Sequence, residues 1–330
     1  MDVLDKIKAP VAAEMEQFRE AFCQTLYHDN PLLEKAVEHL LKAPGKQLRP
    51  MLVLLSARMV GKAGQGSATV NENVIRVAMA LEMLHTASLV HDDVVDESDR
   101  RRGLPSLNAF LSNQAAVLVG DFILSKALEC AALTDDVRVV RYIAQLGQSL
   151  ADGELLQLES QDSEQFSESA YFNVIGRKTA TLFSVCARLG ALAAGGTEAE
   201  AERLAQYGKL IGICFQLRDD IFDYGTAEVG KPLGNDMKEG KLTLPAIYAI
   251  NHSQDEAMRD LAMKVRRREA SAGEIQQLID FAVSQGGLEY AQWHMKDMQR
   301  MADGLIDDSC DASITESLHL LASFVAERVF

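Results

Sequence analysis

Three aspartates spaced as Asp-Asp-x-x-Asp are the side chains of this sequence best suited to chemistry. Asp92, Asp93 and Asp96 end an apolar run that contains no Gly or Pro, which predicts a helix. On a helix Asp92 and Asp96 lie one turn apart on the same face, with Asp93 about 100° further round than Asp92. Carboxylates crowded in this way repel one another, and a hard divalent cation relieves the repulsion. The motif therefore predicts a Mg²⁺ site whose coordination shell is completed by substrate phosphate.

Three consecutive arginines and a glycine, Arg100 to Gly103, follow this motif closely. The forked donors of arginine match the oxygens of a phosphate group. Carboxylates followed by arginines thus suggest a metal and diphosphate site at a helix end. A solvated, charged helix end explains a single acidic triplet equally well.

A second copy of the motif decides between these two interpretations. Asp219, Asp220 and Asp223 repeat the spacing near the end of another apolar helix. A glycine-rich, lysine-bearing segment follows, residues 230–241. Two such clusters can face each other across a helical cleft and hold one diphosphate through several shared Mg²⁺ ions.

With both motifs and their basic followers, the sequence resembles the trans-isoprenyl diphosphate synthases, or polyprenyl synthetases, from about residue 46 to residue 245. The resemblance implies an all-α fold, a single large helical bundle of the isoprenoid synthase type with a central cleft. It implies two or three Mg²⁺ ions bridged by substrate diphosphate. The expected metal ligands are Asp92, Asp93, Asp96, Asp219 and Asp223. The residues expected to carry catalysis are Asp92, Asp93, Asp96, Lys178, Asp219 and Asp220.

The resemblance also extends to residues that would bind two different diphosphates. The segment from Pro44 to Pro50 matches the family motif Gly-Gly-Lys-x-x-Arg-Pro, except that Pro44 replaces its first glycine. For the homoallylic (isopentenyl) diphosphate the matching positions are Gly45, Lys46, Arg49, His85 and Arg102. For the allylic diphosphate they are Arg101, Lys178 and Thr179. Gln216 matches a family position that contacts substrate, and Lys231 and Lys241 match the two lid lysines that bind substrate. Arg100 and His91 match no ligand position; we expect a solvated cation and a hydrogen-bond donor to a carboxylate.

In this family an allylic diphosphate, such as farnesyl or geranyl diphosphate, ionises and is attacked by the double bond of isopentenyl diphosphate. Metal ions and cations take up the charge of the departing diphosphate. An apolar tunnel must then shelter the growing tail, and we expect it to pass Ala87, Ser88, Leu84 and Met83. Ala87 and Ser88 stand where bulky aromatics stop growth in short-chain relatives. This favours a medium- or long-chain product, such as an octaprenyl-type precursor of a quinone side chain, over farnesyl or geranylgeranyl diphosphate.

Two other functions fit parts of the pattern. A class I terpene cyclase shares the first aspartate motif but usually has an Asn/Ser/Glu motif in place of the second, and it lacks a homoallylic site. A non-catalytic subunit of a heteromeric synthase usually has degraded aspartate motifs. Both motifs are intact here, and Lys46 and Arg49 are present. The synthase interpretation therefore has the stronger support.

The composition is that of a globular protein with a sizeable core. The chain has 330 residues, 48% of them apolar, and a formal net charge of −15. That charge argues against nucleic acid and anionic membranes as partners. The five cysteines are far apart, which predicts reduced thiols and a cytoplasmic protein. We expect no signal peptide and no transmembrane segment, and the resemblance implies a homodimer.

Helical periodicity runs through most of the chain, and no convincing strand pair is found. We expect one all-helical domain over residues 1–330, with residues 2–28 forming a single amphipathic helix. Asn30-Pro31 and Asn71 mark helix starts, and capping-box spacing predicts three more, at Thr197, Ser271 and Ser313. The glycine-rich loop from residue 225 to residue 240 is expected to be a lid over phosphate.

Overall fold

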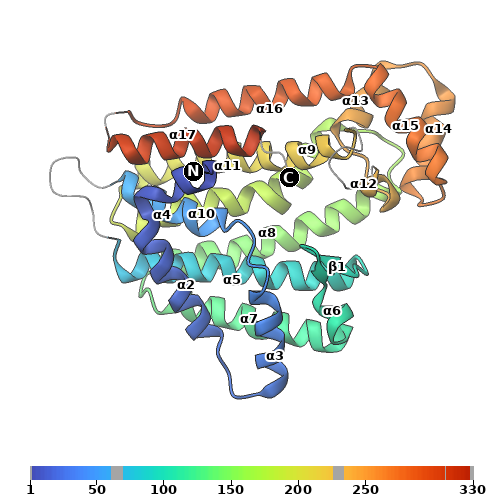
Figure 1. The fold of residues 1–330 in the computed structure, drawn as a ribbon. Coiled ribbons are helices and arrows are strands. Elements are labelled where there is room, and N and C mark those ends of the chain that lie inside the picture. Colours follow the sequence, from blue (N-terminus) through green and yellow to red (C-terminus); the bar gives the residue numbers. More distant parts are fainter. Residues whose placement is uncertain (1, 61–69, 226–233, 309, 328–330) are drawn as a thin grey trace. The chain divides into compact units, whose positions relative to one another are not determined.

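The protein is described by a computed structural model, which covers residues 2–60, 70–225, 234–308 and 310–327. These residues are helical except for turns, connections and one two-residue hairpin, so the all-α prediction is confirmed (Figure 1). Their contacts divide the chain into two compact units. Unit 1 comprises Met1–Gly147, Val185–Ala205 and Asp307–Leu318, and unit 2 comprises Gln148–Ser184, Gln206–Ile306 and His319–Phe330. The single domain over residues 1–330 stays a prediction.

Each unit has its own set of helices. Unit 1 contains α1 (Val3–Lys8), the 3₁₀ turn η1 (Ala9–Val11), α2 (Ala12–Leu26), α3 (Pro31–Leu41), α4 (Leu48–Met59), α5 (Glu72–Val95), β1 (Arg100–Arg101), β2 (Leu104–Pro105), α6 (Leu107–Phe110) and α7 (Asn113–Ala132). Unit 2 contains α9 (Glu168–Ile175), the π-helical turn η2 (Gly176–Ala180), α12 (Asn235–Lys238), α13 (Leu244–His252), α14 (Glu256–Arg266), α15 (Ala272–Ser284) and α16 (Gly287–Asp303). The division between the units falls within α8 (Val137–Asp162), α10 (Thr181–Ala193), α11 (Glu198–Phe222) and α17 (Ala312–Glu327).

Helix α5 is the central element of unit 1 and carries the first aspartate motif at its end. The Asn71 side chain accepts a hydrogen bond from the Val74 amide at 3.1 Å and so caps the helix where the sequence predicts. From Val74 to His85 almost every side chain is buried, because α5 packs against α4 and lies alongside α7 (Figure 1). The packing of α5 in the core of unit 1 therefore determines where the first aspartate motif lies.

The composition of α5 would also suit a helix that crosses a membrane. It is the one helix among the described residues that is long and apolar enough, and 72% of its most apolar stretch is buried inside the structure.

The secondary structure differs from the sequence expectation at three places. The predicted helix over residues 2–28 is interrupted by η1, because Pro10 has no amide hydrogen to donate. The capping boxes at Thr197 and Ser271 are confirmed. At Ser313 the prediction is wrong: the Asp311 side chain instead accepts from the Ser313 amide at 2.8 Å and caps α17. The strand pair missed from the sequence is β1–β2, which is only two residues long.

Two glycines in unit 1 provide a test of how tightly the helices pack. A Cβ added at Gly190 in α10 would lie 2.3 Å from the Val53 carbonyl oxygen of α4, whereas one added at Gly147 in α8 would meet nothing within 4 Å. We expect Gly190→Ala to lower the free energy of unfolding by about 1–3 kcal/mol, because the carbonyl cannot move without shifting α4. Gly147→Ala is the matched control and should stabilise the protein by roughly 0.5–1 kcal/mol. Urea denaturation measures both, and equal effects would contradict the close approach of α10 to α4.

Candidate active site

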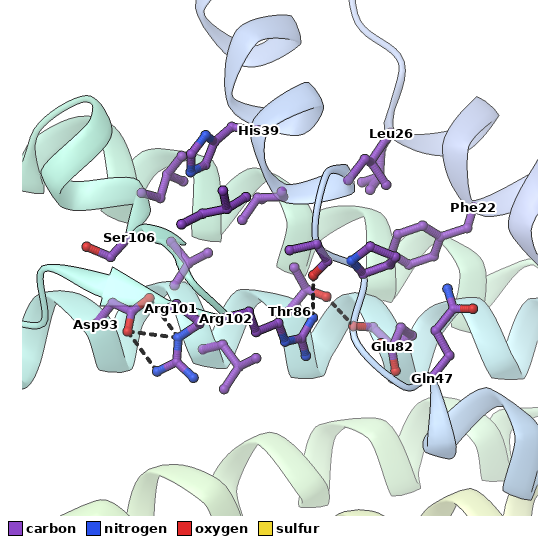
Figure 2. Close-up of a pocket in the computed structure, with 18 of the residues that line it drawn as sticks. Phe22, Leu26, His39, Gln47, Glu82, Thr86, Asp93, Arg101, Arg102 and Ser106 are labelled. Carbon is purple, nitrogen blue, oxygen red and sulfur yellow. Dashed lines mark hydrogen bonds and ion pairs between the residues drawn. The ribbon is translucent and has the colours of Figure 1, made fainter. Parts of the chain in front are cut away.

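The first aspartate motif presents its three carboxylates to different surroundings. The Asp93 side chain is buried, at 2% exposure, while Asp92 is half-buried and Asp96 is exposed. Arg101 binds Asp93 through two nitrogens of its guanidinium. The Nε lies 2.8 Å from both carboxylate oxygens, and a terminal nitrogen lies 2.7 Å from Oδ1 (Figure 2). A charge-assisted, forked pair of this kind compensates for the cost of burying Asp93. Asp92 and Asp96 are the two carboxylates of the motif that solvent reaches.

The hairpin that follows α5 explains how Arg101 reaches back to Asp93. Arg101 pairs with Leu104 across the two-residue turn formed by Arg102 and Gly103. Both turn residues have positive φ, 49° and 80°. This is the backbone of a type I′ turn, in which Gly at the second position is favoured. The turn therefore directs the Arg101 side chain onto the end of α5.

A cavity of about 220 Å³ lies beside this hairpin in unit 1. The Arg102 side chain is fixed at its edge, where a terminal nitrogen donates to the Ala43 carbonyl at 2.8 Å (Figure 2). Gly45 makes room for it: φ is +72°, and an added Cβ would lie 2.6 Å from the guanidinium carbon of Arg102. Polar lining residues include Arg19, Gln47, Glu82, Arg101 and Arg102, and apolar ones include Phe22, Leu26, Leu40 and Leu104. The cavity thus has one cationic region and one apolar region.

Sequence reasoning missed Glu82, which also lines this cavity (Figure 2). The side chain is 6% exposed, and its Oε2 is buried without a hydrogen-bond partner. Burial raises the pKa of the Glu82 carboxyl, and Arg49 and Arg102 oppose that rise. A carboxylate within the apolar run before Asp92 was the available signal, because a buried acid is rare without a partner.

His85 lies one turn after Glu82 and is 8% exposed. Its pKa is well below 6.5 because burial disfavours the charged ring, and Arg49, Arg102 and Arg101 repel a positive charge there. The ring is therefore neutral near pH 7. It can take part in a hydrogen bond to phosphate, but it adds no charge to the cationic region.

Four other sequence-predicted positions do not line this cavity. His91 faces α7, with its Nε2 at 3.2 Å from the Val117 carbonyl and 3.5 Å from the Asp121 carboxylate. Arg100 is exposed and donates to the Gly103 carbonyl at 2.7 Å. Lys46 is exposed and Arg49 half-buried at the start of α4.

The second aspartate motif, in unit 2, has the same division between buried and accessible carboxylates. Asp220 is 3% exposed, whereas Asp219 and Asp223 are half-buried. Tyr171 donates to one Asp220 oxygen at 2.5 Å, and the Gln216 amide donates to the other at 2.8 Å. Burial raises the pKa of Asp220 to about 7, and the charges of Asp219 and Asp223 add to the rise that the two hydrogen bonds oppose.

Lys178 and Thr179 lie in the π-helical turn η2, a kind of turn that is often found at functional sites. Two glycines let neighbouring helices approach it closely. A Cβ added at Gly153 would lie 2.9 Å from the Lys178 amide nitrogen, and a Cβ added at Gly212 would lie 2.7 Å from the Ala180 Cα. The Lys178 ammonium contacts Glu154 at 2.5 Å and Gln157 at 3.3 Å, and the Thr179 hydroxyl donates to Gln216 at 2.8 Å. The turn is thus held against α8 and α11.

A second cavity, of about 480 Å³, lies beside η2 in unit 2. Its lining includes five sequence-predicted residues and two that the sequence did not predict: Lys178, Thr179, Gln216, Asp220 and Lys241, with Asp236 and Arg266. Lys241 forms an ion pair with Glu239 at 2.6 Å. Lys231 lies outside the described residues, as does half of the predicted lid over residues 225–240.

Asp223 binds the backbone at the start of α12. Its two carboxylate oxygens accept from the amides of Asn235 at 3.0 Å and Asp236 at 2.9 Å. The sequence interpretation did not include Asp236. Burial raises its pKa well above the ordinary value, and Asp220 and Asp223 add to the effect.

The donor chemistry at both motifs fits a hard divalent ion. Within the described ranges, no group of three or more His, Cys, Asp or Glu side chains is arranged to hold a metal by itself. Mg²⁺ does not need such a cage, because it binds one or two carboxylates and completes its shell with water and substrate phosphate. Asp92 and Asp96 in unit 1, and Asp219 and Asp223 in unit 2, are partly or fully exposed oxygen donors of that kind.

The residues expected to line a product tunnel are mostly buried. Met83, Leu84 and Ala87 are 0%, 3% and 1% exposed, and half-buried Ser88 donates back to the His85 carbonyl at 2.9 Å. Neither of the two cavities described above is lined by them.

Comparison with known proteins identifies the family. The polyprenyl synthetase family model matches residues 30–282. The chain belongs to the polyprenyl synthetase family. It is thus a polyprenyl diphosphate synthase, a prenyl transferase of isoprenoid biosynthesis.

Relatives of this synthase match it over nearly their whole length. The octaprenyl diphosphate synthase of Haemophilus influenzae is 35% identical over 98% of this chain and 97% of its own. The crystal structure of a Caulobacter crescentus polyprenyl synthase, complexed with calcium and isoprenyl diphosphate, has a TM-score of 0.89, 31% identity and coverage of 99% and 98%. A geranylgeranyl pyrophosphate synthase from Bacteroides thetaiotaomicron has a TM-score of 0.85 and 40% identity, with coverage of 99% and 100%. The predicted fold of the isoprenoid synthase type is confirmed, and a divalent ion in a relative accords with the donor chemistry.

The depressed pKa of His85 makes stability depend on pH. In the unfolded chain His85 takes up a proton near pH 6.5, whereas in the folded protein its pKa is well below that value. The stability that neutral His85 provides is therefore fully present above pH 6.5 and is lost as the pH falls. We expect the free energy of unfolding to fall more steeply between pH 7 and pH 5.5 in the wild-type synthase than in His85→Asn, by up to about 1.4 kcal/mol per pH unit. Urea denaturation at several pH values measures the two slopes. Parallel slopes would show that His85 is not buried as a neutral ring.

Proposed function

We propose that this synthase is a Mg²⁺-dependent enzyme that adds isopentenyl diphosphate head-to-tail to an allylic diphosphate and makes a long-chain, all-trans polyprenyl diphosphate of the octaprenyl type. The observation that carries the proposal is the repeated arrangement of the two motifs. Each has one carboxylate withdrawn and held by protein donors, two that solvent reaches, and a nearby cavity with at least one cation in its lining.

In unit 1, the homoallylic diphosphate would be bound by the cationic region beside Gly45. Arg102 is fixed there by the Ala43 carbonyl, while Lys46 lies just before α4 and Arg49 lies in its first turn. The neutral His85 ring supplies a hydrogen bond without a charge. The five-carbon tail of isopentenyl diphosphate suits the apolar region of the same cavity.

In unit 2, the allylic diphosphate would be bound by Lys178, Thr179, Gln216 and Lys241, which line one cavity. Lys231 matches the second lid lysine of the family and is proposed for the same ligand. Asp92, Asp93, Asp96, Asp219 and Asp223 would hold Mg²⁺, which would supply positive charge to stabilise the departing diphosphate. Asp93 is the least accessible of these, because Arg101 occupies both of its oxygens.

The reaction needs no nucleophilic side chain. The C1–O bond of the allylic substrate breaks, and diphosphate leaves with the electron pair. The double bond of isopentenyl diphosphate attacks the allylic cation, and the released diphosphate takes up the proton that is then lost. The protein side chains bind both diphosphates, orient them and exclude water from the cation.

The octaprenyl-type product is supported by the small residues Ala87 and Ser88 and by the Haemophilus influenzae relative. The second candidate is a short-chain farnesyl or geranylgeranyl product, which the Bacteroides thetaiotaomicron relative supports at 40% identity. Met83, Leu84 and Ala87 are closely packed, so a long tail would require these side chains to shift.

A cytoplasmic homodimer is the proposed state of the enzyme. All five cysteines are free thiols, which suits a reducing compartment. Leu118 and Leu128 on α7 are 67% and 45% exposed, and neighbouring Val117 is 40% exposed. Apolar side chains gathered on one helix are typical of a surface that a second copy covers.

One incubation tests both the reaction and the product length. The purified enzyme is mixed with farnesyl diphosphate, labelled isopentenyl diphosphate and Mg²⁺, and the products are sized by chromatography. We expect a product of about eight isoprene units, no turnover in excess chelator, and losses of several orders of magnitude in Asp92→Ala and Asp219→Ala with the fold retained. Full activity in chelator would contradict the mechanism, and a fifteen- or twenty-carbon product would establish the second candidate.

Gly45→Ala separates the homoallylic site from the rest of the enzyme. The added Cβ would displace the guanidinium of Arg102 and would also strain a residue with φ +72°. We expect the KM for isopentenyl diphosphate to rise by about tenfold, as for the loss of one charge-assisted hydrogen bond, while the KM for farnesyl diphosphate stays within about twofold. Gly103→Ala is the control for backbone strain, because its φ is +80° but its Cβ would meet nothing within 4 Å. Equal KM changes in the two variants would show that Arg102 does not bind this substrate.

A further inference from the structure

We propose that Tyr171 is a positioning residue of this enzyme: its hydroxyl fixes the buried carboxylate of Asp220 and, through it, the two side chains that face the allylic diphosphate, Gln216 and Thr179. The proposal rests on the proposed function of that cavity.

The three side chains form one continuous chain of hydrogen bonds that ends on Tyr171. The Tyr171 hydroxyl donates to Asp220 Oδ2 at 2.5 Å. The Gln216 amide nitrogen donates to Asp220 Oδ1 at 2.8 Å, and the Thr179 hydroxyl donates to the Gln216 amide oxygen at 2.8 Å. Because Thr179 occupies the amide oxygen and Asp220 the amide nitrogen, the orientation of the Gln216 amide is fixed from both ends.

Burial makes this chain stiff and costly to break. Tyr171 and Asp220 are 8% and 3% exposed, so water cannot readily replace the phenol. Burial and the charge of Asp220 raise the pKa of Tyr171 well above 10, and the hydroxyl stays protonated and able to donate. Without it, Asp220 Oδ2 would be a buried carboxylate oxygen that has lost its donor, which is among the larger costs in a protein interior.

The position of Tyr171 in the chain connects it to the ligand-facing turn. It lies on α9, seven residues before Lys178, and both residues line the second cavity. Helix α9 runs directly into the π turn η2, and Asp220 and Gln216 are one turn apart on α11. The bond from Tyr171 to Asp220 therefore ties the helix that carries Lys178 and Thr179 to the helix that carries the second aspartate motif.

The sequence gives little indication of this role. Tyr171 belongs to no motif, and an isolated tyrosine in an apolar helix normally packs in a core with its hydroxyl bonded to any nearby acceptor. What distinguishes it is that its acceptor belongs to the aspartate motif and that the same carboxylate binds Gln216.

Tyr171→Phe tests the proposal, because it removes the hydroxyl and keeps the ring. Steady-state kinetics should show kcat/KM for farnesyl diphosphate falling by about ten- to a hundredfold, as for a lost hydrogen bond to a charged group. The KM for isopentenyl diphosphate should change less than about twofold, since its proposed ligands lie in unit 1. A variant that was merely less stable would not separate the two substrates in this way.

Tyr290→Phe is the matched control. Tyr290 also lies in unit 2 and also donates to a carboxylate, that of Glu168 at 2.9 Å, but it lines neither cavity. It should leave both KM values and kcat unchanged. An equal loss in Tyr171→Phe and Tyr290→Phe would overturn the proposal.

A double-mutant cycle supplies the deciding measurement. If Tyr171 acts through Asp220, Tyr171→Phe should cost less than about twofold in an Asp220→Asn background, whereas Tyr290→Phe should have the same small effect in both backgrounds. Farnesyl diphosphate binding, measured by calorimetry with Mg²⁺, gives the same cycle if Asp220→Asn turns over too slowly to assay. Full additivity, or wild-type kinetics in Tyr171→Phe, would overturn the proposal. An inactive wild-type enzyme would instead contradict the proposed function.

Discussion

The arrangement of both motifs depends on the cost of removing a carboxylate from water. Asp93 and Asp220, each the second aspartate of its motif, are almost completely buried. A buried carboxylate without partners would destabilise the protein by several kcal/mol, so each must be surrounded by donors. Arg101 fills that role for Asp93, and Tyr171 with Gln216 fills it for Asp220. These partners come from outside the motif helices or from a previous turn, and they determine how each motif is presented.

The two solutions differ in charge, with consequences for the neighbouring groups. Arg101 forms an ion pair with Asp93. The charge of Arg101 also helps to lower the pKa of His85 and so to keep that ring neutral. Asp220 receives only neutral donors, so burial and its acidic neighbours raise its pKa to about 7. The first motif thus lies in a cationic environment and the second in an acidic one. Positive charge near the second motif comes from cations such as Lys178, Lys241 and Arg266, and a bound ion would add to it.

Backbone geometry brings the cations into place. A type I′ turn at Arg102-Gly103 directs Arg101 back onto α5, and Gly45 leaves the space that the Arg102 guanidinium fills. In unit 2 the π turn η2 presents Lys178 and Thr179, and Gly153 and Gly212 let α8 and α11 press against it. In each unit a departure from regular helix or strand places the charged side chains, while regular helices such as α5 and α11 supply the rigid frame.

The sequence by itself determined the elements whose causes are local. Helical periodicity predicted the all-α fold, and Asn71, Thr197 and Ser271 correctly marked helix starts, because a cap depends on residues within one turn. The repeated aspartate spacing indicated the family, because each motif lies within five residues of the sequence. Pro10 and Asp311 show the limit of such reasoning. Each acts locally, Pro10 by interrupting a helix and Asp311 by capping one, yet the sequence prediction included neither effect. Only the tertiary structure decided which carboxylates are withdrawn and what holds them. The pairs Arg101–Asp93 and Tyr171–Asp220 join residues 8 and 49 positions apart, and the burial of Glu82 depends on the helices packed around it. Burial and long-range hydrogen bonds arise when elements pack together, and residue spacing along one helix carries no record of them.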